Sequence, residues 1–154
     1  MASLDQLVGS PTVGPSLSFL APAPSTALVT SVALVEDVAD LERVPRHAIV
    51  LLTRVASALA GSYRLDVALR IAASVGVTAL ILCGSAVDDV TPRAGALADR
   101  LGVGLLGAGA GVDLAALAVA IGRELSGGAD AALLRAHTAM RAIHAHPSNP
   151  RETA

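Results

Sequence analysis

The chain has 154 residues, 53% of them hydrophobic, which suits one domain with a substantial buried core. Its formal net charge is −2, which excludes the basic surface of a nucleic-acid binder, and all eleven basic residues are arginine. The chain holds one Phe and one Tyr, which excludes an aromatic platform for stacking bases. The single Cys83 excludes an internal disulfide and fits a reducing compartment, so we expect a cytoplasmic protein.

The first third of the chain is expected to contain one short helix and two strands. Residues 3–9 favour a helix that begins at the N-cap residue Ser3. Residues 17–20 predict a brief strand, and the Pro/Ala-rich stretch 21–25 is a loop inside one domain because it is too short for a domain linker. Residues 27–35 are rich in Val and Leu with partial alternation, which indicates another strand.

An acidic run separates this strand from the next one. Its carboxylates, Glu36, Asp37, Asp40 and Glu42, raise the possibility of a cation site, but a solvated loop with a short helical turn explains them better. Residues 48–53 then form a continuous apolar run, which is typical of a strand covered on both faces.

The stretch from residue 65 to residue 125 alternates helices with short apolar strands. Gly76 is placed to end one helix, whereas Thr91 as N-cap and Pro92 as first helical residue begin another, which Gly102 ends. The expected elements are a helix at 65–75, a strand at 77–83, a polar loop at 87–90, a helix at 92–101, a strand at 103–106, a glycine-rich turn at 107–111 and a helix at 113–125. This rhythm predicts an α/β fold, with a single layer of mostly parallel strands covered by helices.

Residues 102–122 are the one candidate for a membrane span, because the stretch has the length of a bilayer crossing and Asp113 is its only charge. A charge near the centre of a span costs about 3 kcal/mol, and glycines interrupt the helix. A buried strand, turn and helix therefore explain the stretch better. The acidic start of the chain also lacks the basic flank of a signal peptide. We expect no membrane association.

After a hinge at Gly127–Gly128, residues 127–146 are expected to form an exit helix, and the polar residues 147–154 a disordered tail. Apolar residues in this helix alternate at spacings of four and three over about two heptads, too few for an autonomous coiled coil. The residues of this seam, which we expect to serve dimerisation or signalling, are Leu133, Ala136, Met140 and Ile143.

Open α/β sheets bind ligands at the carboxyl ends of their strands. Residues that would lie at those ends here form the candidate ligand site: Thr53, Cys83, Gly84, Ser85, Gly107, Gly109 and Gly111. The three glycines lie between a strand and a helix, where backbone N–H groups can hold an anion. However, no Lys or Ser/Thr follows as in a P-loop, and Asp113 at the helix start would repel a phosphate. A tight turn explains the glycines better.

No catalytic residue, metal site or cofactor is predicted. The G-x-G-x-x-G match at 102–107 starts at a helix end instead of following a strand, so it is a chance match. Cys83 lacks a nearby base, since His47 precedes a neighbouring strand, and is interpreted as a buried structural thiol. His137 and His144 are seven residues apart, whereas helical metal pairs prefer four.

The order of these segments resembles the N-terminal domain of the purine catabolism regulator (PucR-type) family of bacterial transcription regulators. The resemblance covers roughly residues 3–125. It rests on SLDQLVG, on SVALVEDVADLERVP leading into AIVLLT, on a helix into GVTALIL, and on ALADRLGVGLL before an amphipathic helix.

This resemblance implies a non-enzymatic regulatory domain at residues 1–126 that senses a small-molecule effector, forms a homodimer, or does both. In this family a middle domain and a C-terminal helix-turn-helix follow, so DNA would be contacted only by a domain outside this chain. Two alternatives stay open: a small α/β enzyme or nucleotide-binding protein that uses the glycine-rich turn, and a purely structural interaction module.

Overall fold

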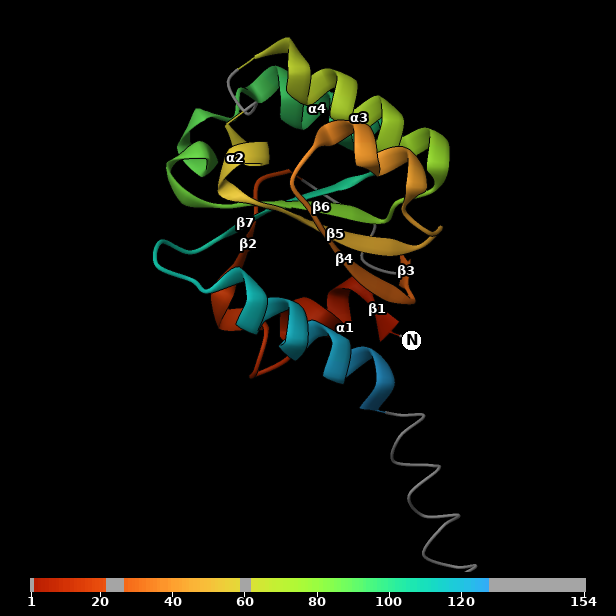
Figure 1. Ribbon diagram of the computed structural model, residues 1–154, viewed down its shortest axis with the longest axis vertical. Helices are drawn as coiled ribbons and strands as arrows, with labels where there is room; N and C mark the ends of the chain where they lie inside the picture. Colours follow the sequence, from red (N-terminus) through yellow and green to blue (C-terminus); the bar gives the residue numbers. More distant parts are fainter. Residues whose placement is uncertain (1, 22–26, 59–61, 128–154) are drawn as a thin grey trace, which may run out of the picture.

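The computed structural model describes residues 2–21, 27–58 and 62–127, which build a five-stranded sheet with helices on both faces (Figure 1). The order across the sheet is β2-β7-β6-β5-β4. Four strands are parallel, and β2 runs antiparallel to β7 at one edge. The predicted α/β fold with a mostly parallel layer is therefore confirmed. The strands are β2 (Leu17–Phe19), β4 (Ser31–Val35), β5 (Ala48–Leu52), β6 (Ala79–Leu82) and β7 (Gly104–Ala108).

The parallel strands follow one another across the sheet in chain order, and this sets where their connections lie. Because such crossovers are right-handed, successive steps in one direction put every connection on the same face. That face carries the 3-10 helix η2 (Val38–Arg43), α3 (Tyr63–Val75) and α4 (Pro92–Leu101), drawn above the sheet in Figure 1. The large side chains that these helices bury against the sheet are Leu41, Leu65, Leu69 and Leu97.

The opposite face is covered by α1 (Leu4–Gly9) and by a helix that runs from residue 114 to residue 127, the last described residue. A two-stranded sheet of β1 (Ala2–Ser3) and β3 (Leu28–Val29) lies on this side as well (Figure 1). The buried residues that the two helices supply to this second core are Leu4, Leu7, Leu117, Ile121 and Leu125. All five residues of β5 are fully buried, alternately in one core and the other, which explains its uninterrupted apolar sequence.

Helix boundaries follow the predicted caps closely. Ser3 forms a capping box with Gln6, and Thr91 caps α4 through a hydrogen bond from the N–H of Ala94. Gly76 and Gly102 end α3 and α4 with φ values of 85° and 73°, a left-handed conformation that favours glycine.

Several segments differ from the sequence prediction. The strand expected at 27–35 is divided at Thr30 into β3 and β4, since the N–H of Thr30 turns to bind the carbonyl of His47 at 2.9 Å. The expected 17–20 strand exists as β2. The prediction lacked β1 and three short helices, namely η1 (Gly14–Ser16), α2 (Arg54–Ser57) and η3 (Gly84–Asp89).

The stretch tested for a membrane span is a strand, a turn and the start of a helix, as predicted. Among the described residues, no helix combines the length and the apolar character needed to cross a bilayer. The expected exit helix and tail, with the seam residues Leu133, Ala136, Met140 and Ile143, lie outside the described residues.

Candidate functional site

The carboxyl ends of β5, β6 and β7 meet at one edge of the sheet, and the predicted site residues follow these three strands. Thr53 comes directly after β5, and Cys83 directly after β6. Gly84 and Ser85 open η3. Gly107 lies within β7, with Gly109 and Gly111 in the turn behind it. The sequence therefore placed these residues at the right edge, and their individual contacts decide what they can do.

The hydroxyl of Thr53 caps a helix. Its Oγ1 accepts a hydrogen bond from the N–H of Ala56 at 3.4 Å and so begins the four-residue helix α2. The last residue of this short helix, Ser57, is buried at the ends of β5 and β6.

Ser57 is fully buried and joins the ends of these two strands. Its Oγ accepts a hydrogen bond from the N–H of Cys83 at 3.1 Å and donates one to the carbonyl of Leu52, also at 3.1 Å. The Cys83 thiol is buried beside it, with Sγ 3.7 Å from the same oxygen. Cys83 thus contributes a backbone group to an internal bridge and has a structural environment, as predicted. Ser57 was missed because nothing in the local sequence distinguishes it from an exposed serine.

The chain leaves β6 and β7 toward opposite faces, which is the arrangement that opens a ligand crevice in many α/β sheets. After β6 it enters η3 and α4, and after β7 it enters the helix at 114–127 on the other face. In this protein, apolar side chains fill the position between β6 and β7 where such a crevice would open. A Cβ built on Gly107 would lie 2.9 Å from Cγ1 of Val87 in η3 and 3.4 Å from Cδ2 of Leu20.

Two N–H groups of the glycine-rich turn are bonded within the fold. The N–H of Gly109 binds the carbonyl of Ser16 at 3.0 Å, and the N–H of Val112 binds the carbonyl of Gly109 at 3.1 Å. Gly111 has a φ of 79°, so the turn needs a glycine there for conformational reasons.

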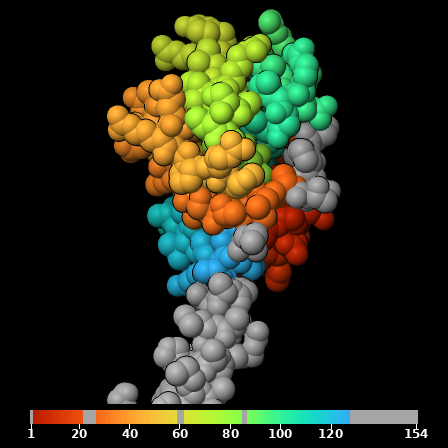
Figure 2. All heavy atoms as spheres, turned by 90° about the vertical axis from the view of Figure 1, so that its right-hand side faces the viewer, coloured from red at the N-terminus to blue at the C-terminus, as the bar shows by residue number. Residues whose placement is uncertain are grey.

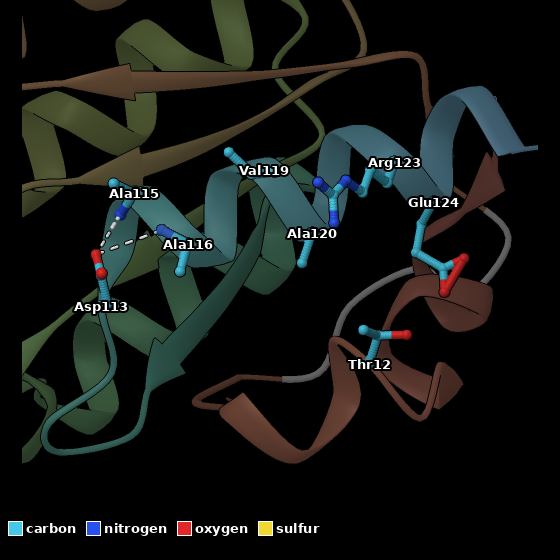
Figure 3. Close-up of a pocket in the computed structure, with 8 residues that line it drawn as sticks. All are labelled: Thr12, Asp113, Ala115, Ala116, Val119, Ala120, Arg123 and Glu124. Carbon is cyan, nitrogen blue, oxygen red and sulfur yellow. Dashed lines mark hydrogen bonds between the residues drawn. The ribbon is translucent and has the colours of Figure 1, made fainter.

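The helix behind this turn begins with a carboxylate cap. Oδ1 of Asp113 accepts hydrogen bonds from the N–H groups of Ala115 and Ala116 at 3.0 and 3.3 Å (Figure 3). A negative charge therefore already occupies the position that an anion would take at the helix N-terminus. The start of this helix is therefore capped by the chain itself.

Two open hollows lie on the surface. The first, of about 600 Å³, runs along the helix at 114–127 beside Thr12, which faces Arg123 and Glu124 across it (Figure 3). Three of its eight lining residues are alanine, and its Glu124 accepts a hydrogen bond from the buried Ser10. The second, of about 470 Å³, lies between Leu20 and the outer side of α4, with Thr91 and Asp99 as its polar residues. Val87 also lines it, so this hollow adjoins the apolar side chains that pack over Gly107. Neither hollow contains a predicted site residue.

Within the described ranges, no three His, Cys, Asp or Glu side chains gather in an arrangement that could hold a metal ion. The acidic run at 36–42 is divided between a bend and η2, where Asp37 accepts a hydrogen bond from the N–H of Ala39 and so serves as an N-cap. His137 and His144 lie outside the described residues.

No model of a known protein family matches this sequence, and a comparison with curated proteins finds no match. The resemblance to PucR-type regulators therefore stays a prediction that rests on the segments quoted above.

Proposed function

We propose that this chain is a non-enzymatic regulatory domain of a bacterial transcription regulator, of the PucR type, and that it works by self-association. The segment resemblance supports the family. The observation that favours self-association is that side chains of the chain itself occupy the strand ends. Ser57 bonds to both β5 and β6, and Val87 fills the space over β7.

An enzyme or nucleotide-binding site needs several polar groups that converge on an open space. At these strand ends the hydroxyls of Thr53 and Ser57 and the N–H groups of Cys83 and Gly109 are already bonded within the fold. A small-molecule effector would have to displace Val87 or use one of the open hollows. A small-molecule effector therefore has a secondary role in this mechanism.

The path of the signal follows from the last described helix. Residues 114–127 pack one face into the sheet through Leu117, Ile121 and Leu125 and lead directly into residues 128–154. In the proposed mechanism, association of two domains biases the segment at 127–146, and this segment passes the bias to a DNA-binding domain outside this chain.

The test joins residues 1–154 to a monomeric DNA-binding domain that represses a reporter only when dimerised. We expect repression, and weaker repression from a fusion of residues 1–126, which lacks the seam at Leu133, Ala136, Met140 and Ile143. Sedimentation equilibrium of the unfused chain should show a monomer–dimer equilibrium. A chain that stays monomeric at all concentrations and gives no repression would refute the proposal.

A thermal-shift screen with purine bases, nucleosides and nucleotides separates association from ligand sensing. We expect no compound to raise the melting temperature, whereas higher protein concentration should raise it, because dimerisation stabilises the folded state by mass action. A saturable shift with one compound and none with concentration would favour the ligand-sensing alternative instead.

A further inference from the structure

The open hollow beside the last described helix has polar residues at one end and small apolar residues beside them. It measures about 600 Å³, within the range of about 300–1,000 Å³ that is typical of small-molecule sites. Thr12, Arg123 and Glu124 form the polar end, next to Ala116 and Ala120 (Figure 3). In Figure 2 the blue helix and the red N-terminal segment, which form its two sides, lie side by side below the orange part of the sheet.

A buried serine holds the polar end in place. Ser10 is only 8% exposed, and its hydroxyl donates a hydrogen bond to Oε1 of Glu124 and accepts one from the N–H of Thr12 at 3.2 Å. One hydroxyl therefore positions the Glu124 carboxylate and the Thr12 backbone on the two sides of the hollow. A site that is ordered in advance loses less conformational freedom when a ligand binds.

Three groups at the polar end have no partner among the described residues. These are the guanidinium of Arg123, the hydroxyl of Thr12 and Oε2 of Glu124. The side chains of Arg123 and Thr12 are exposed, and that of Glu124 is partly buried. The polar end thus offers one cation, one carboxylate oxygen and one hydroxyl to a ligand in the same space.

The other carboxylate of the hollow, Asp113, is too far away to share a small ligand with these groups. It precedes Arg123 by ten residues, which corresponds to about 15 Å along a helix. Its Oδ1 also accepts the hydrogen bonds that cap the helix start. A small ligand at the polar end therefore meets one positive and one negative charge, those of Arg123 and Glu124.

This pair of charges selects between classes of ligand. A simple anion that binds Arg123 is repelled by Glu124, and a simple cation at Glu124 is repelled by Arg123. A zwitterion fits both, because its carboxylate can bind Arg123 and the Thr12 hydroxyl while its ammonium binds Glu124. Ala116 and Ala120 leave room for an apolar side chain and offer no side-chain hydrogen bond to a sugar or a base.

We infer that this hollow binds a free α-amino acid with an aliphatic side chain. The ligand carboxylate lies at Arg123 and Thr12, and its ammonium lies at Glu124. Its side chain packs against Ala116 and Ala120. The bound ligand joins the N-terminal segment to the helix that ends the described part of the chain. The inference goes beyond the proposed function by giving a small-molecule effector a place and a chemical class.

Titration of the isotope-labelled full chain with L-alanine, L-valine and L-leucine tests the site by NMR. A ligand of this size in an open site should have a dissociation constant of about 1 mM, so titration to about 20 mM approaches saturation. At least one of the three amino acids should shift the amide signals of Thr12, Arg123 and Glu124 in a saturable way. The absence of a saturable shift with all three overturns the inference.

Two derivatives of the amino acid that binds distinguish a zwitterion site from a simpler one. The N-acetyl derivative lacks the ammonium, and the amide derivative lacks the carboxylate. Each should bind at least about tenfold more weakly than the parent amino acid, because each loses a charge-assisted hydrogen bond. If either derivative binds as tightly as the parent, the hollow is a plain anion or cation site and the inference is wrong.

Substitutions connect each charged group of the ligand to its residue. Arg123→Gln should weaken binding of the amino acid about tenfold and leave its amide derivative unaffected. Glu124→Gln should weaken the amino acid similarly and leave the N-acetyl derivative unaffected, and its amide oxygen can still accept the hydrogen bond from Ser10. Arg54→Gln, at an exposed position in α2, is the matched control and should leave binding unchanged. Equal binding by Arg123→Gln and Arg54→Gln contradicts the inference, and thermal melts show that each variant is folded.

The outcome does not depend on self-association. A chain that binds the amino acid and stays monomeric supports this inference and refutes the proposed self-association. A chain that dimerises and binds none of the three amino acids does the reverse.

Discussion

Ser57→Ala removes the one side chain that bonds to both strand ends at the candidate site. Ser57 is fully buried, and its Oγ holds the N–H of Cys83 and the carbonyl of Leu52, each at 3.1 Å. Alanine fits the same space without a hydroxyl, so the substitution leaves a buried N–H without a partner. An unsatisfied buried group costs about 1–3 kcal/mol, and the lost bond to the carbonyl adds about 1 kcal/mol.

We therefore expect Ser57→Ala to lower the free energy of unfolding by about 2–4 kcal/mol. For a domain of this size each kcal/mol lowers the melting temperature by about 3–5 °C, so the loss should be roughly 6–20 °C. Differential scanning calorimetry measures this loss. Amide hydrogen exchange followed by NMR supplies a local readout, because the exchange of the Cys83 N–H should accelerate more than that of Leu80 in the middle of β6.

Ser18→Ala, at an exposed position in β2, is the matched control and should change stability by less than about 0.5 kcal/mol. If Ser57→Ala and Ser18→Ala melt within about 2 °C of each other, less than a 1 kcal/mol loss would produce, then the bridge does not hold the strand ends and the reasoning is wrong.

Three further substitutions test other features. Gly107→Ala should cost about 1–3 kcal/mol by overpacking, because its Cβ would lie 2.9 Å from Val87, and Val87→Ala should recover part of this loss in the double variant. His47→Val should cost about 1–2 kcal/mol because His47 has a φ of 62°, whereas His47→Gly should not. Ser31→Ala should gain about 1 kcal/mol, since Oγ of Ser31 is buried and finds no partner among the described residues. Urea denaturation measures the free energy of unfolding of these variants. A change of the opposite sign in one of them contradicts the argument for that substitution alone.

The parallel layer could be predicted from the sequence because its signals are local. Residues 48–52 are apolar without interruption, as a strand buried on both faces must be, and each major helix begins at a capping side chain or ends at a glycine. Gly76 and Gly102 have positive φ values that other residues rarely adopt, so the sequence marks where α3 and α4 end. The separation of β3 from β4 could not be predicted, because it depends on the N–H of Thr30 bonding to His47, seventeen residues away.

The position of the candidate site could be predicted from the sequence, but the chemistry of its residues could not. That Thr53, Cys83 and Gly107 share an edge follows from parallel pairing alone. Whether their polar groups are free depends on contacts between distant residues, such as Ser57 with Cys83 and Val87 with Gly107. These contacts arise in short helices, α2 and η3, whose sequences carry little periodicity. A segment of four to six residues gives too few turns for a pattern to emerge.

The winding of the chain also determines which parts of the sheet are filled and which are left uncovered. Four parallel strands laid down in one direction leave a single place where neighbouring connections diverge, between β6 and β7. Val87 fills that place, and the bridge through Ser57 joins the neighbouring pair of strands. The same winding leaves the first parallel strand, β4, without a neighbouring strand on its outer side among the described strands. A fold that packs Val87 over β7 and leaves an apolar edge strand exposed is better arranged to contact another protein surface than to bind a small molecule at its strand ends.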